Sequence, residues 1–526
     1  MPKLLSIARL VAPALALALL PSAAGAQQAA PSEKPVLGFY LHACWDYRAP
    51  FAVRKWSPDD YQRMLRLLQR FDYNTVMFWP VTEAIPMPIS DEDRQALERF
   101  RDILAGAQQM GHRAWLVTCP NLGVPPEIAK KPWMERNFWP SMIHYRLDDA
   151  EQKQTLLARR QAIFQVLNNA DAYITIDGDP GGYAGAKPED WFAVFAADRQ
   201  VIDEFGTAPE QQLIVPWLWS GWGTRGVWGE PIDPFIDAEL KVLLENWDQL
   251  TPALLLAGRG GPWRPYYRDV IKVVERQQAI DRSVLFCYAA VEREPSPPAP
   301  ELRFDWIRRM VIEEESQHRD EVRGWMANAQ QPIMVIPNIY LFARCVQDPA
   351  YAEREDRAVL QDCAKLFGGP EAALVTAWSC LQLPLEELPE SVATQLRQTP
   401  FDGPAANDLP GGEQTYREIL ASAVDCRRAV LLAVQSPTDV QKVEAAVAAL
   451  GKWWALSRYA FSQTAGDGQL NWGWIHHDLV GPLRAAARGQ RDQLLPHQAQ
   501  FAAALANSAG LTPAAAQRAV EQLLAP

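Results

Sequence analysis

The stretch SPDDYQRMLRLLQRFDYNTVMFWP, residues 57–80, contains the two kinds of element from which the fold is predicted. Its first part, residues 57–71, repeats apolar residues at helical spacing, with Ser57 as a candidate N-cap and Pro58 at the first helical position. Its last part, residues 75–80, is a short apolar run that predicts a buried strand. An amphipathic helix next to a buried strand is the repeating unit of parallel α/β folds.

The same unit recurs along the first two thirds of the chain. Amphipathic helical stretches, such as residues 91–111, 148–170, 188–206 and 264–280, separate short strand-like runs. Because such connections are long and helical, the strands are expected to pair in parallel. The expected strands are VLGFYLH (36–42), TVMFWP (75–80), RAWLVTC (113–119), AYITIDG (172–178), QLIVPWLW (212–219), ALLLAG (253–258), VLFCYAAV (284–291) and IMVIPNIY (333–340).

Eight strand–helix units predict an α/β fold of the (β/α)8 TIM-barrel type. The competing architecture is an open doubly wound sheet, which normally carries a Gly-rich first turn, whereas FYLHACWDYRAPF (39–51) follows here. From about residue 350 the chain changes character, and after DLPGGE (408–413) it becomes helical and Ala-rich. We therefore expect a barrel over residues 27–350, a linker and helical connection over 351–412, and a C-terminal all-α domain over 413–526.

The first 26 residues have the pattern of a secretory signal peptide. Lys3 and Arg9 precede the apolar stretch LVAPALALALL, and SAAGA ends in small residues, so cleavage is expected after Ala26. No later run is apolar for long enough to cross a membrane. The sequence thus predicts a soluble protein that is secreted or periplasmic.

Composition narrows the possible partners. The chain has 51 basic and 63 acidic residues, a formal charge of −12, which argues against a nucleic-acid partner. Seven scattered cysteines, an odd number without CxxC spacing, argue against a disulfide framework and leave any pairing open. The 20 tryptophans can serve the core, but indole faces also stack on sugar rings, so an oligo- or polysaccharide ligand fits this composition.

In a barrel of this type the active site lies at the carboxyl ends of the strands. Carboxylates with aromatic and amide side chains at that rim are typical of sugar chemistry, in which two carboxyls act on a glycosidic bond. The residues that this rule selects are His42, Trp45, Asp46, Trp79, Glu83, Asn121, Asp177, Asp179, Trp217, Trp219, Trp222, Arg259, Tyr288, Glu292, Asn338 and Tyr340.

The motif YITIDGDPGG (173–182) ends the fourth expected strand with two acids. An EF-hand loop starting at Asp177 would need a glutamate at its twelfth position, which is Pro188, and a phosphate loop would need a Lys and a Ser or Thr. A plain turn remains possible. Alternatively, Asp177 and Asp179 share one face of the strand, about 6–7 Å apart, and raise each other's proton affinity.

This pair resembles the strand-4 carboxylates of barrel hydrolases that remove N-acetylhexosamines, the family 18, 20 and 84 glycoside hydrolases. Residues 56–80 are also similar to the corresponding region of family 20-type and α-glucuronidase barrels. The resemblance implies that one carboxylate is the general acid and its neighbour steadies the acetamido group of the substrate, which acts as nucleophile. This chain has Asp-Gly-Asp where those families have Asp-Glu, Asp-Asp or Asp-x-Glu, and the exact family stays open.

We therefore expect a cofactor-free glycoside hydrolase. Asp179 is the expected general acid, and Asp177 orients it or the substrate. A second layout pairs Asp179 with Glu292 as nucleophile, and Glu83 is a third rim carboxylate that could hold a sugar hydroxyl or act as base.

The alternatives are a non-catalytic glycan-binding barrel and a different carbohydrate-active hydrolase, such as a metal-dependent deacetylase. No metal ligand set is expected, because the seven histidines are dispersed apart from His476 and His477. Adjacent histidines point in different directions on a helix, so we expect a structural or interface role for that pair. The helical domain could also support an oligomer.

Overall fold

The structure is a computed structural model in which residues 36–526 form one compact unit. Among the residues that it describes, no helix combines the length and the apolarity needed to cross a membrane. The described residues are 34–43, 47–119, 122–123, 125–133, 136, 143–176, 187–218, 232–259, 267–293, 297–314, 318–457, 470 and 472–525.

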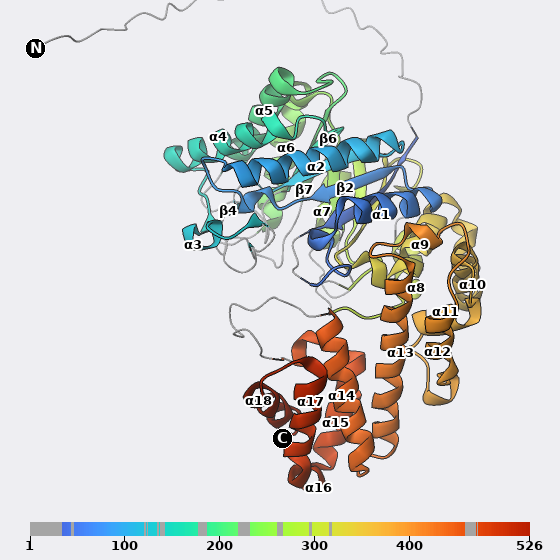
Figure 1. The fold of residues 1–526 in the computed structure, drawn as a ribbon. Helices are drawn as coiled ribbons and strands as arrows, with labels where there is room; N and C mark the ends of the chain where they lie inside the picture. Colours follow the sequence, from blue (N-terminus) through green and yellow to red (C-terminus); the bar gives the residue numbers. More distant parts are fainter. Residues whose placement is uncertain are drawn as a thin grey trace, which may run out of the picture. The chain divides into compact units, whose positions relative to one another are not determined.

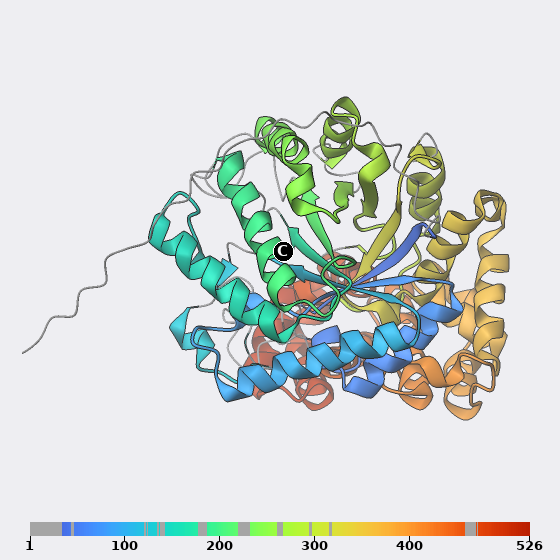
Figure 2. The same ribbon diagram turned by 90° about the horizontal axis from the view of Figure 1, so that it is seen from above.

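Eight parallel strands close into a barrel, which confirms the predicted (β/α)8 architecture. Around the barrel the order is β1, β2, β3, β6, β7, β8, β9 and β10, and β10 pairs with β1. Figure 2 shows helices around the outside of these strands. The strands span Val36–His42 (β1), Thr75–Trp79 (β2), Arg113–Thr118 (β3), Ala172–Ile176 (β6), Leu213–Leu218 (β7), Leu255–Arg259 (β8), Ser283–Cys287 (β9) and Gly324–Ala329 (β10). A separate antiparallel pair joins β4, Leu122–Gly123, to β5, Ile143–His144.

Helices alternate with the barrel strands (Figure 1). The α-helices of this part are α1 (Pro58–Arg70), α2 (Asp91–Gln109), α3 (Pro126–Ala129), α4 (Ala150–Val166), α5 (Pro188–Phe205), α6 (Ile232–Glu245), α7 (Tyr267–Arg276), α8 (Phe304–Arg308) and α9 (Ile336–Gln347). Short 3-10 turns are η1 (Val53–Lys55), η2 (Thr82–Ala84), η4 (Trp247–Leu250), η5 (Ile280–Arg282) and η8 (Pro332–Met334), and a π-helical turn, η6, spans Arg309–Glu314.

Helix α1 forms as its sequence predicts. The Ser57 side chain accepts a hydrogen bond from the backbone of Asp60, whose carboxylate accepts one from the Ser57 N–H at 3.0 Å, so that the two residues form a capping box. Pro58 occupies the first helical position, where no N–H partner is needed. Met64 and Leu68 lie on the buried face of the helix. Local signals and burial therefore agree at this element.

The predicted eighth strand at residues 333–340 is wrong. Pro332–Met334 form the 3-10 turn η8 and Ile336–Gln347 form α9, and the eighth strand is β10, Gly324–Ala329. Every residue from 333 to 340 is buried, so the helix lacks a polar stripe, and Pro337 sits in its first turn, where proline is tolerated. Strand β10 itself, GWMANA, has no β-branched residue to mark it. It begins at Gly324 (φ 144°), where a Cβ would lie 2.1 Å from the β1 backbone.

The barrel core is apolar. Every residue of β1, β2, β6, β9 and β10 is buried. Strands covered on both faces have continuous apolar sequences rather than alternating ones, which explains why these runs are easy to detect. The six cysteines among the described residues are all buried and form no disulfide with one another.

The C-terminal part is all α-helical, which confirms the predicted fold class. Its α-helices are α10 (Asp356–Phe367), α11 (Glu371–Trp378), α12 (Ser391–Gln398), α13 (Glu413–Gln435), α14 (Val440–Ser457), α15 (His477–Gly489), α16 (Arg491–Leu494), α17 (Gln498–Ala509) and α18 (Pro513–Leu523). The turns η9 (Pro349–Glu353), η10 (Leu385–Glu387), η11 (Ala406–Asp408), η12 (Trp472–Trp474) and η13 (Leu495–His497) complete it.

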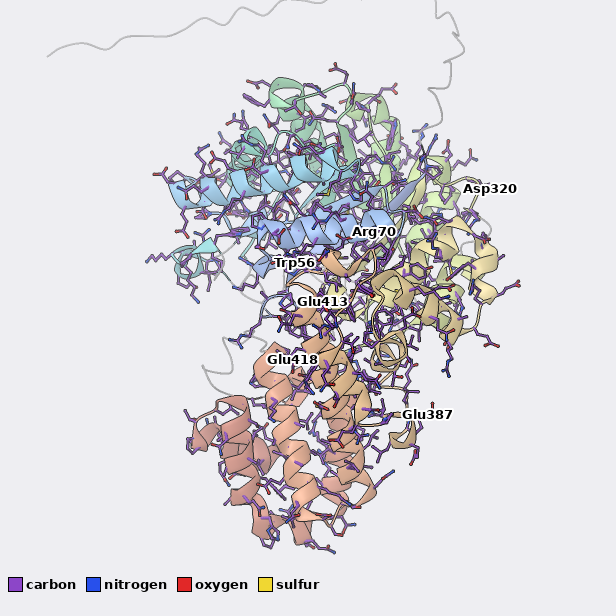
Figure 3. All side chains as sticks on the ribbon, turned by 45° about the vertical axis from the view of Figure 1, so that its right-hand side comes forward. Trp56, Arg70, Asp320, Glu387, Glu413 and Glu418 are labelled. Atoms are coloured by element: carbon purple, nitrogen blue, oxygen red, sulfur yellow. The ribbon has the colours of Figure 1, made fainter. Side chains whose placement is uncertain are left out.

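Polar contacts connect this helical region to the barrel. Asp408, whose side chain is 3% exposed, receives Arg66 at 2.8 Å and also Arg70, both from α1 (Figure 3 labels Arg70). At the carboxyl end of the barrel, the indole of Trp453 on α14 donates to the carbonyl of Pro298 at 3.1 Å. The helical region thus contacts a loop at the rim where the active site is expected.

Candidate active site

The candidate residues from the sequence divide into those that the structure describes and those that it does not. Arg259 ends β8, but its side chain lies outside the described part of the structure. The candidates that lie wholly outside the described residues are Trp45, Asp46, Asn121, Asp177, Asp179, Trp219 and Trp222. The candidates with described side chains are His42, Trp79, Glu83, Trp217, Tyr288, Glu292, Asn338 and Tyr340.

Glu83 lies just beyond β2, in η2, and is 1% exposed. The residue that begins this turn, Val81, has left-handed backbone angles (φ 59°, ψ 51°), which redirect the chain at the strand end. One Glu83 oxygen accepts a hydrogen bond from the Trp79 indole at 2.9 Å, and the other accepts one from the backbone N–H of Cys119. Burial raises the pKa of Glu83, while the Arg159 guanidinium and these hydrogen bonds lower it. The carboxyl is therefore held through both oxygens.

His42 ends β1 beside Trp79, its register partner on β2. The two rings meet edge to face, with centroids 4.7 Å apart and an interplanar angle of 82°. Burial lowers the pKa of His42 to about 3, so the imidazole is neutral at physiological pH. A neutral ring at this place can exchange hydrogen bonds with a hydroxyl group without adding charge.

Glu292 follows β9 and is 3% exposed. One of its oxygens accepts hydrogen bonds from two successive backbone N–H groups, those of Gln330 at 2.5 Å and Gln331 at 3.0 Å. Burial raises the pKa of Glu292 to about 8, and the neighbouring charge of Glu301 adds to this, whereas the two N–H groups and Arg303 oppose it. Glu292 is therefore a carboxyl that keeps its proton at neutral pH.

Tyr47 is a buried neighbour of Glu292 that the sequence interpretation missed. Burial raises the pKa of Tyr47 well above its ordinary value, the charge of Glu292 raises it further, and a hydrogen bond with the Gln331 side chain lowers it. Tyr47 lies five residues after the end of β1, in the stretch CWDYRAP, which also contains the candidates Trp45 and Asp46, so the rim rule could have included it. Gln330 and Gln331 were missed because the eighth strand was misplaced.

Strand register brings the two described carboxyls to one part of the rim. The last paired residues of β1 and β10 are Leu41 and Ala329, so His42 and Gln330 are the next residues along the two strands, and His42 is paired with Trp79 on β2. Glu83 hydrogen-bonds to Trp79, and Glu292 hydrogen-bonds to the backbone of Gln330. Both carboxyls are thus connected through consecutive groups on neighbouring strands, each buried and each with a raised pKa.

Trp217 and Tyr288 lie deeper than a sugar-stacking surface would. Trp217, on β7, is 2% exposed, and its ring meets Phe286 at 4.5 Å and Tyr40 at 5.7 Å, both in edge-to-face geometry. Tyr288, 7% exposed, follows β9. Both side chains are buried in the core of the barrel near the carboxyl ends of the strands.

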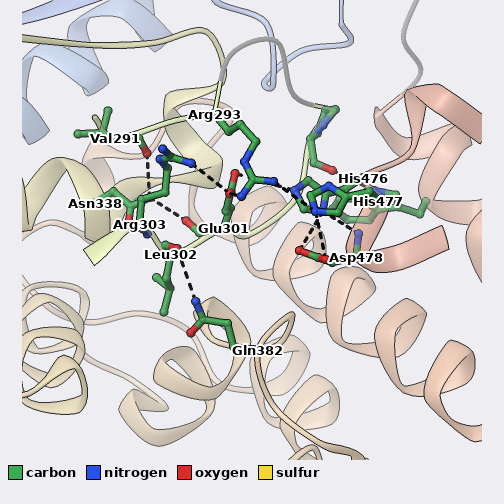
Figure 4. Close-up of polar contacts among 12 residues, drawn as sticks. Val291, Arg293, Glu301, Leu302, Arg303, Asn338, Gln382, His476, His477 and Asp478 are labelled. Atoms are coloured by element: carbon green, nitrogen blue, oxygen red, sulfur yellow. Dashed lines mark hydrogen bonds and ion pairs between the residues drawn. The ribbon is translucent and has the colours of Figure 1, made fainter. Parts of the chain in front are cut away.

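Asn338 and Tyr340 do not end a strand, because α9 occupies their position. Asn338 is fully buried and serves the β9–α8 connection: its amide donates to Val291 O at 2.8 Å and Glu301 O at 2.7 Å, and its oxygen accepts from Arg303 N at 3.1 Å (Figure 4). The prediction placed Asn338 at the end of a strand, and this placement is wrong.

Tyr340 likewise lies in α9 and not at the end of a strand. Its ring meets Phe71 edge to face at 5.3 Å, the Arg344 guanidinium lies 5.2 Å from its centroid, and its hydroxyl lies 3.4 Å from that of Tyr351. These neighbours belong to the outer helical layer of the barrel. The residue that the correct strand end supplies instead is Asn328, whose oxygen accepts from the Ala289 N–H at 3.1 Å.

His476, His477 and Asp478 are close enough to share a metal ion, since their ligand atoms lie within 4.8 Å of one another. However, the Arg293 guanidinium lies 3.3 Å from His477 Nε2 and competes with a cation for that nitrogen. His476 Nε2 lies 3.9 Å from the Glu301 carboxylate (Figure 4). The group therefore fits a charged network between the helical region and the rim better than a metal centre.

Comparison with known proteins shows similarity of fold alone. No protein-family profile and no curated protein matches the sequence. A GH138 enzyme targeting pectin rhamnogalacturonan II is 10% identical over 94% of this chain and 83% of its own, with a TM-score of 0.46. An O-GlcNAc hydrolase from Thermobaculum terrenum is 11% identical over 88% of this chain and 96% of its own, with a TM-score of 0.42. A GH5 xyloglucan-specific endo-β-1,4-glucanase from a metagenomic library is 14% identical over 60% of this chain and 95% of its own, with a TM-score of 0.36. These structural neighbours are glycoside hydrolases, and at this similarity they leave family and substrate open.

Proposed function

We propose that this protein is a glycoside hydrolase that cleaves a glycan by acid/base catalysis at the carboxyl rim of the barrel. The observation that carries the proposal is the pair of buried carboxyls, Glu83 and Glu292, connected through Trp79, His42 and Gln330. Burial raises the pKa of both acids, and carboxyls of altered proton affinity at the rim of a barrel are typical of catalytic sites.

The surroundings of the two carboxyls support different roles. Burial raises the pKa of both carboxyls. The Arg159 guanidinium opposes this at Glu83, whereas at Glu292 the like charge of Glu301 adds to it and Arg303 opposes it, and the pKa of Glu292 is raised to about 8. Two carboxyls whose environments separate their proton affinities match an acid and a base or nucleophile. We therefore assign Glu292 to proton donation to the glycosidic oxygen rather than to nucleophilic attack.

The sequence-based layout made Asp179 the general acid, with Asp177 as its orienting neighbour and Glu292 as a possible nucleophile. With Glu292 as the proton donor, we propose instead that Asp179 is the carboxylate that works opposite it. A hexosaminidase-like layout, with Asp179 as general acid, is the alternative that we keep. In either layout the leaving oxygen takes a proton from the acid, and water completes the cleavage of the bond. We further propose export with cleavage after Ala26, which N-terminal sequencing of the protein from its native host would test.

The proposal is tested with a panel of aryl glycosides and bacterial polysaccharides, comparing the wild type with Asp179→Asn and Glu292→Gln. Both variants should lose turnover by orders of magnitude while keeping the far-UV circular dichroism of the wild type. Glu387→Gln, at an exposed position, is the matched control and should remain fully active.

The outcomes separate the alternatives. Glycan binding without turnover, unchanged in Asp179→Asn and in a variant that also lacks Asp177, would identify a non-catalytic glycan-binding barrel instead. Release of acetate that a chelator abolishes would identify a metal-dependent deacetylase. Near-normal hydrolysis by both carboxyl variants would refute the site assignment.

A further inference from the structure

Glu301 is the centre of a charged group behind Glu292. Its side chain is 11% exposed, and its carboxylate lies 3.1 Å from Arg293, 3.5 Å from Arg303 and 3.9 Å from His476 (Figure 4). Arg293 directly follows Glu292 in the sequence, Arg303 precedes α8, and His476 is the N-cap of α15 in the helical region. The Glu301 carboxylate thus connects three groups: Arg293, which is next to the candidate acid, Arg303 in the barrel, and His476 in the C-terminal helical region.

The same carboxylate is part of the electrostatic surroundings of Glu292. The charged or titratable groups that act on Glu292 are Glu301, whose charge disfavours ionisation, and Arg303, whose charge favours it, and Glu292 in turn acts on the Tyr47 phenol. The groups that face Glu301 are Arg293, Arg303 and His476. Beyond them, His477 lies 3.3 Å from Arg293, and Asp478 lies 3.2 Å from His477.

We propose that Glu301 is a positioning residue for Glu292: it anchors the segment that carries Glu292 to the helical region and supplies the negative charge that this carboxyl faces. The inference deepens the proposed function, and it relies on that function only for the catalytic use of Glu292. Asn338 supports the arrangement, because its amide donates to the backbone carbonyls of Val291, which precedes Glu292, and of Glu301 itself.

Opposite effects on Glu292 are expected from the two neighbouring charges. Removing the Glu301 charge deletes a repulsive neighbour and leaves Arg293 and Arg303 without their shared counter-ion. Both changes favour ionised Glu292, so its proton should dissociate at lower pH. Removing the Arg303 charge deletes an attractive neighbour, so the proton should dissociate at higher pH. A role limited to packing predicts no such pair of opposite shifts.

The test measures the contribution of Glu292 to stability as a function of pH, which requires no substrate. Urea unfolding is followed by tryptophan fluorescence from pH 5 to 9 for the wild type, Glu301→Gln and Arg303→Gln, each with and without Glu292→Gln. The difference within each pair reports the ionisation of Glu292 in the folded protein. Plotted against pH, this difference has a higher midpoint where Glu292 ionises in the folded protein. That midpoint should lie roughly one pH unit lower in Glu301→Gln than in the wild type, and higher than in the wild type in Arg303→Gln.

Equal midpoints in all three backgrounds would overturn the proposal, even if the variants are less stable. Should Glu301→Gln not fold, Glu301→Asp retains the charge and should leave the midpoint in place, while Arg303→Gln still provides the opposite shift. A wild type that cleaves no glycoside but shows the shifts would refute the proposed function alone. If hydrolysis needs Glu292 but the pH midpoint of Glu292 ionisation is the same in the wild type and in Glu301→Gln, this inference alone is refuted.

Discussion

Replacing Glu292 with glutamine should change how the stability of the protein depends on pH. Glutamine has the shape of the protonated carboxyl, and its carbonyl oxygen can accept the same two hydrogen bonds, from Gln330 and Gln331. The native pKa of Glu292 is about 8, whereas the carboxyl of the unfolded chain titrates near 4.5. Between these values the native protein keeps a proton that the unfolded chain has released. The free energy of unfolding of the wild type therefore falls as pH rises from 4.5 to about 8. In the Glu292→Gln variant this contribution to the pH dependence is absent.

The size of the effect follows from the two pKa values. Below pH 4.5 both states are protonated, and above pH 8 both are ionised, so the whole effect develops between these limits. From pH 5 to pH 7 the wild type should lose roughly 2–3 kcal/mol relative to Glu292→Gln, at 1.36 kcal/mol for each pKa unit. Urea unfolding followed by tryptophan fluorescence at half-unit pH steps measures this difference directly.

A matched control isolates the buried group from the general pH response. Glu387 lies in η10 at an exposed position (Figure 3), and Glu387→Gln should give a curve parallel to that of the wild type across the same range. If Glu292→Gln is also parallel to the wild type between pH 5 and 7, Glu292 ionises normally in the folded protein, and its assignment as a proton donor is refuted.

Three further substitutions test the packing of the barrel, at the rim and at the opposite end of the strands. Trp79→Phe removes the indole donor to buried Glu83 and should cost about 1–3 kcal/mol of unfolding free energy, with a loss of any activity that depends on Glu83. Arg160→Met breaks a buried ion pair with Asp198 at 2.5 Å and should cost about 3–5 kcal/mol in urea unfolding, most of which Asp198→Asn in the same chain should restore. Gly324→Ala places a methyl group 2.1 Å from the β1 backbone and should prevent accumulation of folded protein, seen as loss of soluble expression.

The fold could be predicted from the sequence wherever local signals and burial agree. Residues 58–70 combine a capping box, an N-terminal proline and a one-sided apolar pattern, and they form α1. Seven strands were predictable because residues buried on both faces give unbroken apolar runs. The same property caused the error at residues 333–340, since a helix buried on all sides gives an unbroken apolar run as well.

The site was predictable only as far as it depends on strand ends. Glu83, His42 and Glu292 follow from the position of their strands, and they do lie at the rim. The backbone donors at Gln330 were hidden by the misplaced eighth strand. Glu301 was not predictable by the same rule, because it contacts His476, which lies 175 residues further along the chain and in another part of the fold.

Backbone strain provides a separate reason to regard this rim as functional. Among the described residues, four that are not glycine have left-handed φ angles: Asp72, Val81, Gln278 and Ala289. Asp72 and Gln278 follow the ends of α1 and α7, where such residues commonly terminate helices. Val81 and Ala289 instead follow β2 and β9, shortly before Glu83 and Glu292. A left-handed residue other than glycine costs about 1–3 kcal/mol, and glycine would avoid this cost. The two strained turns at the rim are the ones that lead to Glu83 and Glu292. The strain is therefore better explained by precise placement of these two carboxyls than by stability of the loops.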